Sequence, residues 1–205
     1  MDAQTRRQEA VSRHKRDLIL QAARKVFEQE GLEGASLRLI AREAGYTPAA
    51  LYFHFESKEA IYAELLALSL ESLKAELATA ASAKAPGKRL KSAAMAFFRF
   101  YAENPRDLDL GFYLFRGGMK PAGLGKARDE ELNKALAAAL DPIAAAAADL
   151  GATDEEARAL LVNCFAHATG LLLLLHTGRM RMFEVSPERL MESYVDQELL
   201  TLTQR

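Results

Sequence analysis

Apolar residues in the first third of the chain recur every three or four positions, which is the spacing of one helix face. Two adjacent apolar rows run through residues 16–30 and stop at Gly31. A narrower row runs through residues 37–44 and consists of Leu37, Ile40, Ala41 and Ala44. The pattern predicts a first helix with a broad buried face and a second helix with a narrow one.

A turn and a short helix follow the second row. Gly45 ends that row, because a residue without a Cβ turns the chain out of a helix at little steric cost. Thr47 offers a side-chain oxygen as N-cap, and Pro48 suits the first helical position, where no N–H is needed. The short helix, expected over residues 48–54, completes a predicted helix-turn-helix.

The short helix carries an aromatic and basic face that its own burial does not use. Leu51 and Phe55 lie four residues apart on the face that points to the core. Tyr52, Phe53 and His54 lie on the other faces. One explanation is that the two aromatic residues pack against the neighbouring helix. The order of helix, Gly turn, capped short helix and a Lys at the next helix start favours contact with DNA instead.

The rest of the chain continues the helical pattern. A long apolar stripe predicts a helix over residues 58–84, and the Ala-Pro-Gly sequence at 85–87 marks the start of a second structural unit. Further helices are expected over residues 88–103, 107–116 and 126–150, with Pro142 marking a kink or a break in the last of these. Thr153 or Asp154 is expected to cap an eighth helix, and a ninth should run from 187 nearly to the end. The loop at 117–125 is too rich in glycine for a helix. We therefore expect an all-α fold of about nine helices.

Composition agrees with an all-α protein that is not a general DNA coat. Half of the residues are hydrophobic, Ala and Leu dominate, and the formal net charge is −1. A near-neutral chain has no global attraction to nucleic acid, so a basic surface has to come from local arrangement. The single cysteine, Cys164, excludes an intramolecular disulfide and fits a reducing compartment.

No secretory signal opens the chain, and the most apolar run, residues 170–175, is too short to span a membrane. We expect a cytoplasmic protein without a membrane partner.

The motifs of common enzymes are absent. The sequence has no Gly-x-Ser-x-Gly elbow, no phosphate-binding glycine loop and no His-Glu-x-x-His pair. His167 and His176 are nine residues apart, which places them on opposite sides of one helix. Cys164 and His167 are one turn apart, but a stable metal site wants three or four ligands. We expect no catalytic activity, no cofactor and no bound metal.

One set of residues carries a resemblance to a known family. It runs from the first helix to the start of the fourth and comprises Ala22, Phe27, Gly31, Ser36, Ile40, Ala41, Ala44, Gly45, Leu51, Tyr52, Phe53, His54, Phe55, Ser57 and Lys58. With this set, residues 16–66 resemble the DNA-binding domain of the TetR family of transcriptional regulators. The resemblance implies a helix-turn-helix DNA-binding domain over 15–60 and an effector-binding and dimerisation domain over 61–205.

The resemblance also implies which residues contact DNA. The candidates are Arg38, Tyr46, Thr47, Pro48, Ala49, Ala50, Tyr52, Phe53, His54 and Lys58. The planar fork of Arg38 suits guanine O6 and N7, whereas Tyr52, His54 and Lys58 are expected on phosphates. The short helix has little hydrogen-bonding reach to base edges, so direct readout should fall largely on Arg38. Tyr46 departs from the small aliphatic residue that is usual in the family.

Residues 1–14 are predicted to form a flexible N-terminal arm. They are polar, with Arg6, Arg7 and Arg13 among Gln, Glu and Ser. Such a segment is either a frayed, solvated terminus or a basic arm that lies along phosphates or enters the minor groove.

The second unit contains two further candidate sites. An apolar effector pocket would be formed by Phe97, Phe98, Tyr101, Phe112, Tyr113, Phe115, Arg116, Cys164 and His167. By resemblance, the last two helices form a homodimer interface through Leu160, Leu161, Leu171, Leu172, Leu175, Leu190 and Tyr194. For any one of these residues, packing in an internal core is the competing explanation.

Together these features predict a dimeric, ligand-responsive transcriptional regulator, in the first place a repressor. Its partners would be a palindromic double-stranded DNA operator and a small, largely apolar effector that releases it. Two other classes remain open: an all-α carrier or enzyme whose helix-turn-helix is only structural, and an architectural DNA protein without an effector.

Overall fold

The computed structural model of the protein describes residues 2–111 and 123–204. This part contains nine α-helices and one 3₁₀ helix, and no strand occurs within it. The prediction of an all-α fold with about nine helices is therefore confirmed. The described residues form two compact units, one from Met1–Leu68 and Leu110–Asp129 and the other from Ser69–Asp109 and Glu130–Arg205. The structural division thus falls inside the fourth helix, whereas the sequence placed a boundary after residue 60.

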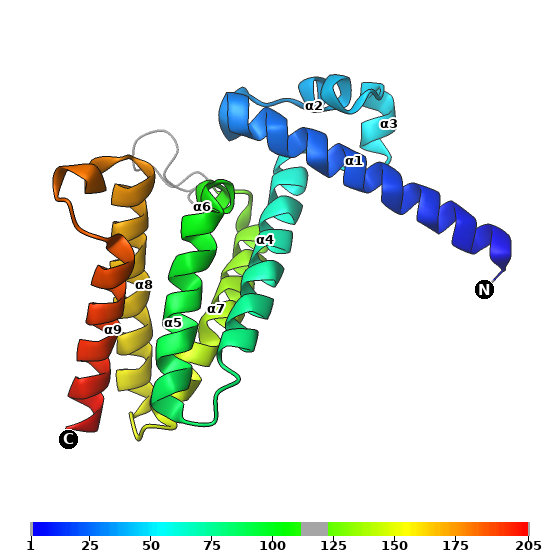
Figure 1. Ribbon diagram of the computed structural model, residues 1–205. Helices are drawn as coiled ribbons and strands as arrows, with labels where there is room; N and C mark the ends of the chain where they lie inside the picture. Colours follow the sequence, from blue (N-terminus) through cyan, green and yellow to red (C-terminus); the bar gives the residue numbers. More distant parts are fainter. Residues whose placement is uncertain (1, 112–122, 205) are drawn as a thin grey trace. The chain divides into compact units, whose positions relative to one another are not determined.

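The first unit contains α1 (Ala3–Gly34), α2 (Leu37–Ala44), α3 (Pro48–Tyr52) and the beginning of α4 (Lys58–Ala80) (Figure 1). α2 packs against both α1 and α3. At Gly31, φ is 68° and ψ is 178°, so the helical path breaks inside α1 where the sequence ended the first helix. The three helices make the predicted helix-turn-helix.

The caps of α2 and α3 agree with the sequence. The Ser36 hydroxyl accepts a hydrogen bond from the N–H of Leu39 at 3.2 Å, and Gly45 closes α2 in the left-handed region at φ 72°. The Thr47 hydroxyl accepts from the N–H of Ala50 at 3.2 Å. These caps satisfy helix-terminal N–H groups that would otherwise have no partner. Only the end of α3 differs, because the helix stops at Tyr52, before the predicted residue 54.

The core of the first unit joins α1, α2, α3 and α4. Ile19, Ile40 and Leu51 have at most 1% of their surface exposed. Phe27 meets Tyr62 edge to face, with ring centroids 5.0 Å apart. Burial of side chains of this size stabilises the fold by roughly 1.5–3 kcal/mol each. The helix-turn-helix therefore rests on a packed base.

Arg16 ties three elements of this unit together. Its Nε lies 2.7 Å from Oε1 of Glu64 on α4, and its Nη1 donates to the carbonyl oxygen of His54 at 2.9 Å. The guanidinium also lies 4.2 Å above the centre of the Phe55 ring. A planar group with five donors can serve all three partners at once. Arg16 thereby fixes the chain directly after α3.

The second unit is a helical bundle formed by the later part of α4 and the helices that follow. Its elements are α5 (Pro86–Glu103), α7 (Lys126–Ala148), α8 (Asp154–His176), the 3₁₀ helix η2 (Arg179–Met182) and α9 (Pro187–Thr203). The helices α5, α8 and α9 pack on one another. The short helix α6 (Pro105–Gly111) leads back to the first unit.

Two expectations need correction. Residues 3–14 are not an irregular arm but the first turns of α1, because Ala, Gln, Arg and Glu favour helix even where no apolar stripe is present to signal it. Of the kink or break expected at Pro142, the break does not occur, because α7 continues as one helix across this residue. The expected helix at 107–116 and loop at 117–125 lie partly outside the described residues.

Candidate nucleic-acid interface

The last residue of α3 and the residue after it expose two large aromatic side chains. Tyr52 is 62% exposed and Phe53 is 89% exposed, whereas Leu51 and Phe55 are buried. The alternative in which these two aromatic residues pack against the neighbouring helix is therefore wrong for this chain. Large exposed aromatic side chains on a well-capped helix indicate a contact surface.

All ten candidate residues for this surface line one of two hollows beside α3. Arg38, Pro48, Tyr52 and Lys58 line a hollow between the starts of α2 and α4. The other six line a hollow that also includes Lys15 and Ile19 of α1, and they are Tyr46, Thr47, Ala49, Ala50, Phe53 and His54. The structure thus brings the sequence-predicted set together on both flanks of one short helix.

Arg38 is free to reach a partner outside the chain. Its side chain is exposed, and its guanidinium makes no hydrogen bond or ion pair with residues 2–111 or 123–204. It shares its hollow with Glu56, but that carboxylate is paired with Arg128. A planar donor fork on the first turn of α2 can therefore approach a pair of acceptors such as guanine O6 and N7.

Lys58 has a role in the fold that the sequence did not reveal. Its Nζ donates to the carbonyl oxygens of Leu32, Glu33 and Ala35 at 2.8, 3.2 and 3.1 Å. An ammonium group has three donors, and these bonds use all of them. They satisfy carbonyl groups where α1 ends. The predicted phosphate contact of Lys58 therefore competes with a capping role.

Comparison with known proteins identifies this unit. Residues 19–65 match the bacterial regulatory proteins of the tetR family. Residues 19–65 thus form a DNA-binding domain of the TetR type. The predicted resemblance is confirmed over the helices that carry the exposed aromatic residues.

Two curated relatives match part of the chain. The transcriptional regulator AcrR of Shigella flexneri is 41% identical over 75 residues, which are 37% of this chain and 34% of AcrR. The uncharacterized regulator YdgC of Bacillus subtilis is 32% identical over 106 residues, which are 48% of this chain and 53% of YdgC. The matched part of the chain thus spans about half or less of the length of these relatives.

The fold likeness extends further than the sequence likeness. The Bacillus subtilis regulator FadR, solved in complex with stearoyl-CoA, aligns with a TM-score of 0.68 over 89% of this chain and 96% of FadR. The sequences are 15% identical, so this match shows a shared fold only.

The TetR-type effector site predicted in the second unit is only partly brought together. Phe97, Phe98 and Tyr101 are buried on α5, and the Phe97 ring lies 5.2 Å from Tyr101 and 5.6 Å from Phe165 of α8. Phe165 belongs to this aromatic cluster, although the predicted set omitted it. Its place in the apolar sequence of α8 was the available signal. The other four predicted residues of the 112–116 segment, Phe112, Tyr113, Phe115 and Arg116, lie outside the described residues.

His167 and Cys164, two polar members of that predicted site, lie near α9 instead. His167 stacks on Tyr194 of α9, with ring centroids 4.0 Å apart and planes 11° from parallel. Burial lowers the pKa of His167, and it raises the pKa of Cys164 to about 12. Both groups are therefore neutral near pH 7. No cluster of three potential metal ligands occurs among residues 2–111 and 123–204.

The predicted dimer residues divide into core and surface. Leu160, Leu171 and Leu172 are buried inside the second unit, which favours the competing explanation of internal core packing for these three. Leu161, Leu175 and Tyr194 are half-buried, and Leu190 is 39% exposed. A stripe that the sequence did not single out is more exposed and consists of Ala159, Val162, Ala166, Gly170 and Leu173 on α8. Because α8 carries apolar residues on every side, the periodicity of its sequence does not show which face is exposed.

The exposed guanidinium generates the first prediction. Arg38→Ala should lose roughly 1–3 kcal/mol of binding free energy on a site with guanine at its partner position, because a bidentate base contact is removed. The loss should be much smaller on the same site with that base pair substituted. Equilibrium binding at one fixed salt concentration measures both values. Equal losses on the two sites would show that Arg38 does not read a base.

The capping role of Lys58 generates the second prediction. Lys58→Met keeps the apolar stem but leaves three carbonyl groups without their donor, so the free energy of unfolding should fall by roughly 1–3 kcal/mol. Urea denaturation measures this loss. Lys25→Met is the control, since Lys25 makes an exposed ion pair with Glu43 and should matter little.

The same variant distinguishes the two roles of Lys58. A phosphate contact would be seen as a reduction of about one in the slope of log affinity against log salt. The capping role leaves that slope unchanged. An unchanged stability together with a reduced slope would contradict the capping role and support the phosphate contact.

Proposed function

We propose that this TetR-family DNA-binding regulator acts as a dimeric repressor that binds a palindromic operator and is released by a small, largely apolar effector. The observation that carries the proposal is the outward face at α3, where Tyr52 and Phe53 are exposed. Tyr52 shares a hollow with Arg38, whose guanidinium has no partner among the residues that the structure describes. In a helix-turn-helix, the recognition helix, which here is α3, enters the major groove. Phe53 and Ala50 would offer apolar contact to thymine methyl groups, and Tyr52 and His54 would bind phosphates.

The exposed stripe on α8 supports a dimer. Among the described residues, α8 is the one helix that is long and apolar enough to cross a membrane. Only 28% of the residues in its most apolar 18-residue stretch are buried in the chain. Val162 and Leu173 are 58% and 56% exposed, and the small residues Ala159, Ala166 and Gly170 lie between or beside them. Small residues let a second helix approach closely, so a second copy of the chain would cover this stripe.

A two-fold dimer explains why a repressor of this kind would need a palindrome. Each copy supplies one α3, and the two half-sites of the operator repeat under the same symmetry. Half-sites of such operators lie one helical turn of DNA apart, about 34–36 Å, or a multiple of it. The DNA partner would place the protein in the cytoplasm of a bacterial cell.

The aromatic cluster of α5 and α8 supports an apolar effector. The Phe97 ring meets Tyr101 edge to face and Phe165 at a tilt of 51°. Stearoyl-CoA, bound by the fold relative FadR, has a long apolar chain. An effector that favours a conformation with low DNA affinity would weaken binding of the operator, and the operator would weaken binding of the effector. A coupling free energy of about 1–3 kcal/mol between the two sites changes the occupancy of the operator several-fold. A carrier or enzyme with a structural helix-turn-helix predicts no enrichment of any DNA sequence.

Selection of bound fragments from random duplex DNA tests the proposal. The wild-type chain should enrich one inverted repeat and should sediment as a dimer. Leu173→Arg introduces a charge into the apolar stripe and should give a monomer with at least tenfold weaker binding to the full repeat. Ala138→Arg, at an exposed position of α7, is the matched control and should change neither property.

Failure to enrich any sequence would overturn the DNA-binding proposal. A wild-type monomer that binds a single half-site would overturn the dimer but leave the DNA-binding role intact.

A further inference from the structure

The apolar stripe of α1 continues toward the N-terminus as a polar stripe. Positions 26, 22 and 19 are buried at 6%, 5% and 1% exposure and face the core of the first unit. Further steps of four or three residues lead on to positions 15, 11, 8 and 4, which are exposed. Those four positions hold Lys15, Val11, Gln8 and Gln4. One face of α1 therefore packs in the core at positions 19–26 and is exposed at positions 4–15.

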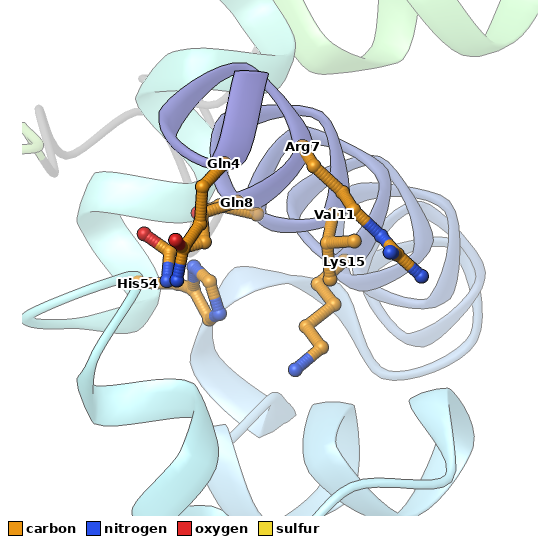
Figure 2. A pocket seen from close by; sticks show the side chains of 7 residues that line it. Gln4, Arg7, Gln8, Val11, Lys15 and His54 are labelled. Carbon is orange, nitrogen blue, oxygen red and sulfur yellow. The ribbon is translucent and has the colours of Figure 1, made fainter. Parts of the chain in front are cut away.

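This surface forms one wall of a groove beside α3. Gln4, Arg7, Gln8, Val11, Ser12 and Lys15 of α1 line it together with His54, which follows α3 (Figure 2). Figure 2 shows Gln4 and Gln8 on the side of His54, with Arg7 and Lys15 opposite. The groove is about 530 Å³ in volume. It is lined by residues of the first unit alone.

The chemistry of the lining selects an anion. Two cations, two amide groups, a hydroxyl and an imidazole can all donate hydrogen bonds, and no carboxylate is among the lining residues. The hollow next to Arg38 differs, since Glu56 and Glu59 line it. Residues 3–15 as a whole carry Arg6, Arg7, Arg13 and Lys15 against the single acidic residue Glu9. Such a groove fits phosphate groups better than an uncharged ligand.

The groove is also continuous with the surface of α3. Lys15 and His54 line both this groove and the hollow formed by Ala49, Ala50 and Phe53. A DNA strand that passes α3 along that hollow would therefore run into the groove. The part of α1 from Gln4 to Lys15 is about 16 Å long at 1.5 Å per residue. This length corresponds to about five base pairs of duplex.

From these observations we infer that the N-terminal turns of α1 bind the sugar-phosphate backbone of DNA that flanks the segment contacted by α3. Arg7 and Lys15 neutralise phosphates, and Gln4, Gln8 and Ser12 donate to phosphate oxygens. The contact positions the protein without reading sequence, because phosphates are the same at every base pair. The inference rests on the proposed DNA-binding function and adds a rigid, helical second contact to it.

The helix offers a matched control for this contact. Arg13 is exposed and belongs to the same turns of α1, but it is not among the residues that line the groove. It is two positions before Lys15, so the two side chains point about 160° apart. Arg7→Ala and Arg13→Ala remove the same charge from the same segment and differ in the face that loses it.

The test uses the operator selected from random DNA as two duplexes. One ends at the last base pair of the inverted repeat, and the other carries ten further base pairs of unrelated sequence on each side. Arg7→Ala should bind the long duplex about tenfold more weakly than the wild type and the short duplex within twofold of it. The salt slope on the long duplex should also fall, by about one for each phosphate contact that is lost.

A second variant keeps the helix intact while changing the charge in the groove. Gln8→Glu introduces a carboxylate that repels phosphate, so it should also weaken binding to the long duplex only. Circular dichroism checks that both variants keep the helical content of the wild type. Arg13→Ala should bind each duplex within twofold of the wild type.

Three results would overturn the inference. These are equal losses for Arg7→Ala and Arg13→Ala, a loss for Arg7→Ala that persists on the short duplex, and a wild type that binds both duplexes equally. The last result leaves the proposed DNA-binding function standing. A wild type that selects no DNA at all would instead contradict the proposed function and, with it, this inference.

Discussion

The arrangement of the first unit depends on holding α3 in place from outside, because α3 is only five residues long. A helix of this length is not stable by its own hydrogen bonds. The Thr47 cap fixes its start, Leu51 anchors its middle in the core, and Arg16 holds the His54 carbonyl directly after its end. The other groups of Arg16 reach Glu64 and the Phe55 ring, so the same side chain joins α1 to α4. Without these contacts the exposed Tyr52 and Phe53 would have no defined direction.

The basic residues of the first unit fall into two groups, those that stabilise the fold and those that are exposed on the candidate DNA surface. Arg16 and Lys58 are both occupied by partners within the first unit. Arg38 is exposed on α2, and Arg7 and Lys15 line an open groove on α1. A chain with a net charge of −1 can therefore still present a local cationic surface in the α1 groove, because no carboxylate lines that groove. The hollow beside Arg38 does contain carboxylates, those of Glu56 and Glu59. Affinity for DNA would come from this placement and not from total charge.

Local signals in the sequence were sufficient for the helix-turn-helix but not for the contacts that brace it. Gly45, Thr47 and Pro48 act through their own backbone positions, so the bounds of α2 and the start of α3 followed directly. The Arg16 and Lys58 contacts join residues 23 to 48 positions apart, and no local pattern announces them. The exposed face of α8 was also hidden, because an almost uniformly apolar helix has no periodicity to show which side is buried. The helical N-terminus escaped prediction for the opposite reason, since it has almost no apolar residues.

The account stands on one claim, that the outward face of α3 touches DNA. Photo-crosslinking tests it most directly, with p-benzoylphenylalanine placed at position 53 and, as a control, at position 183. Both Phe53 and Phe183 are exposed, but Phe183 belongs to the second unit. The account predicts that position 53 crosslinks to base pairs inside the half-site of the selected operator and that position 183 does not crosslink. Crosslinking from position 183 alone, or from neither position in a complex that binds DNA tightly, would contradict it.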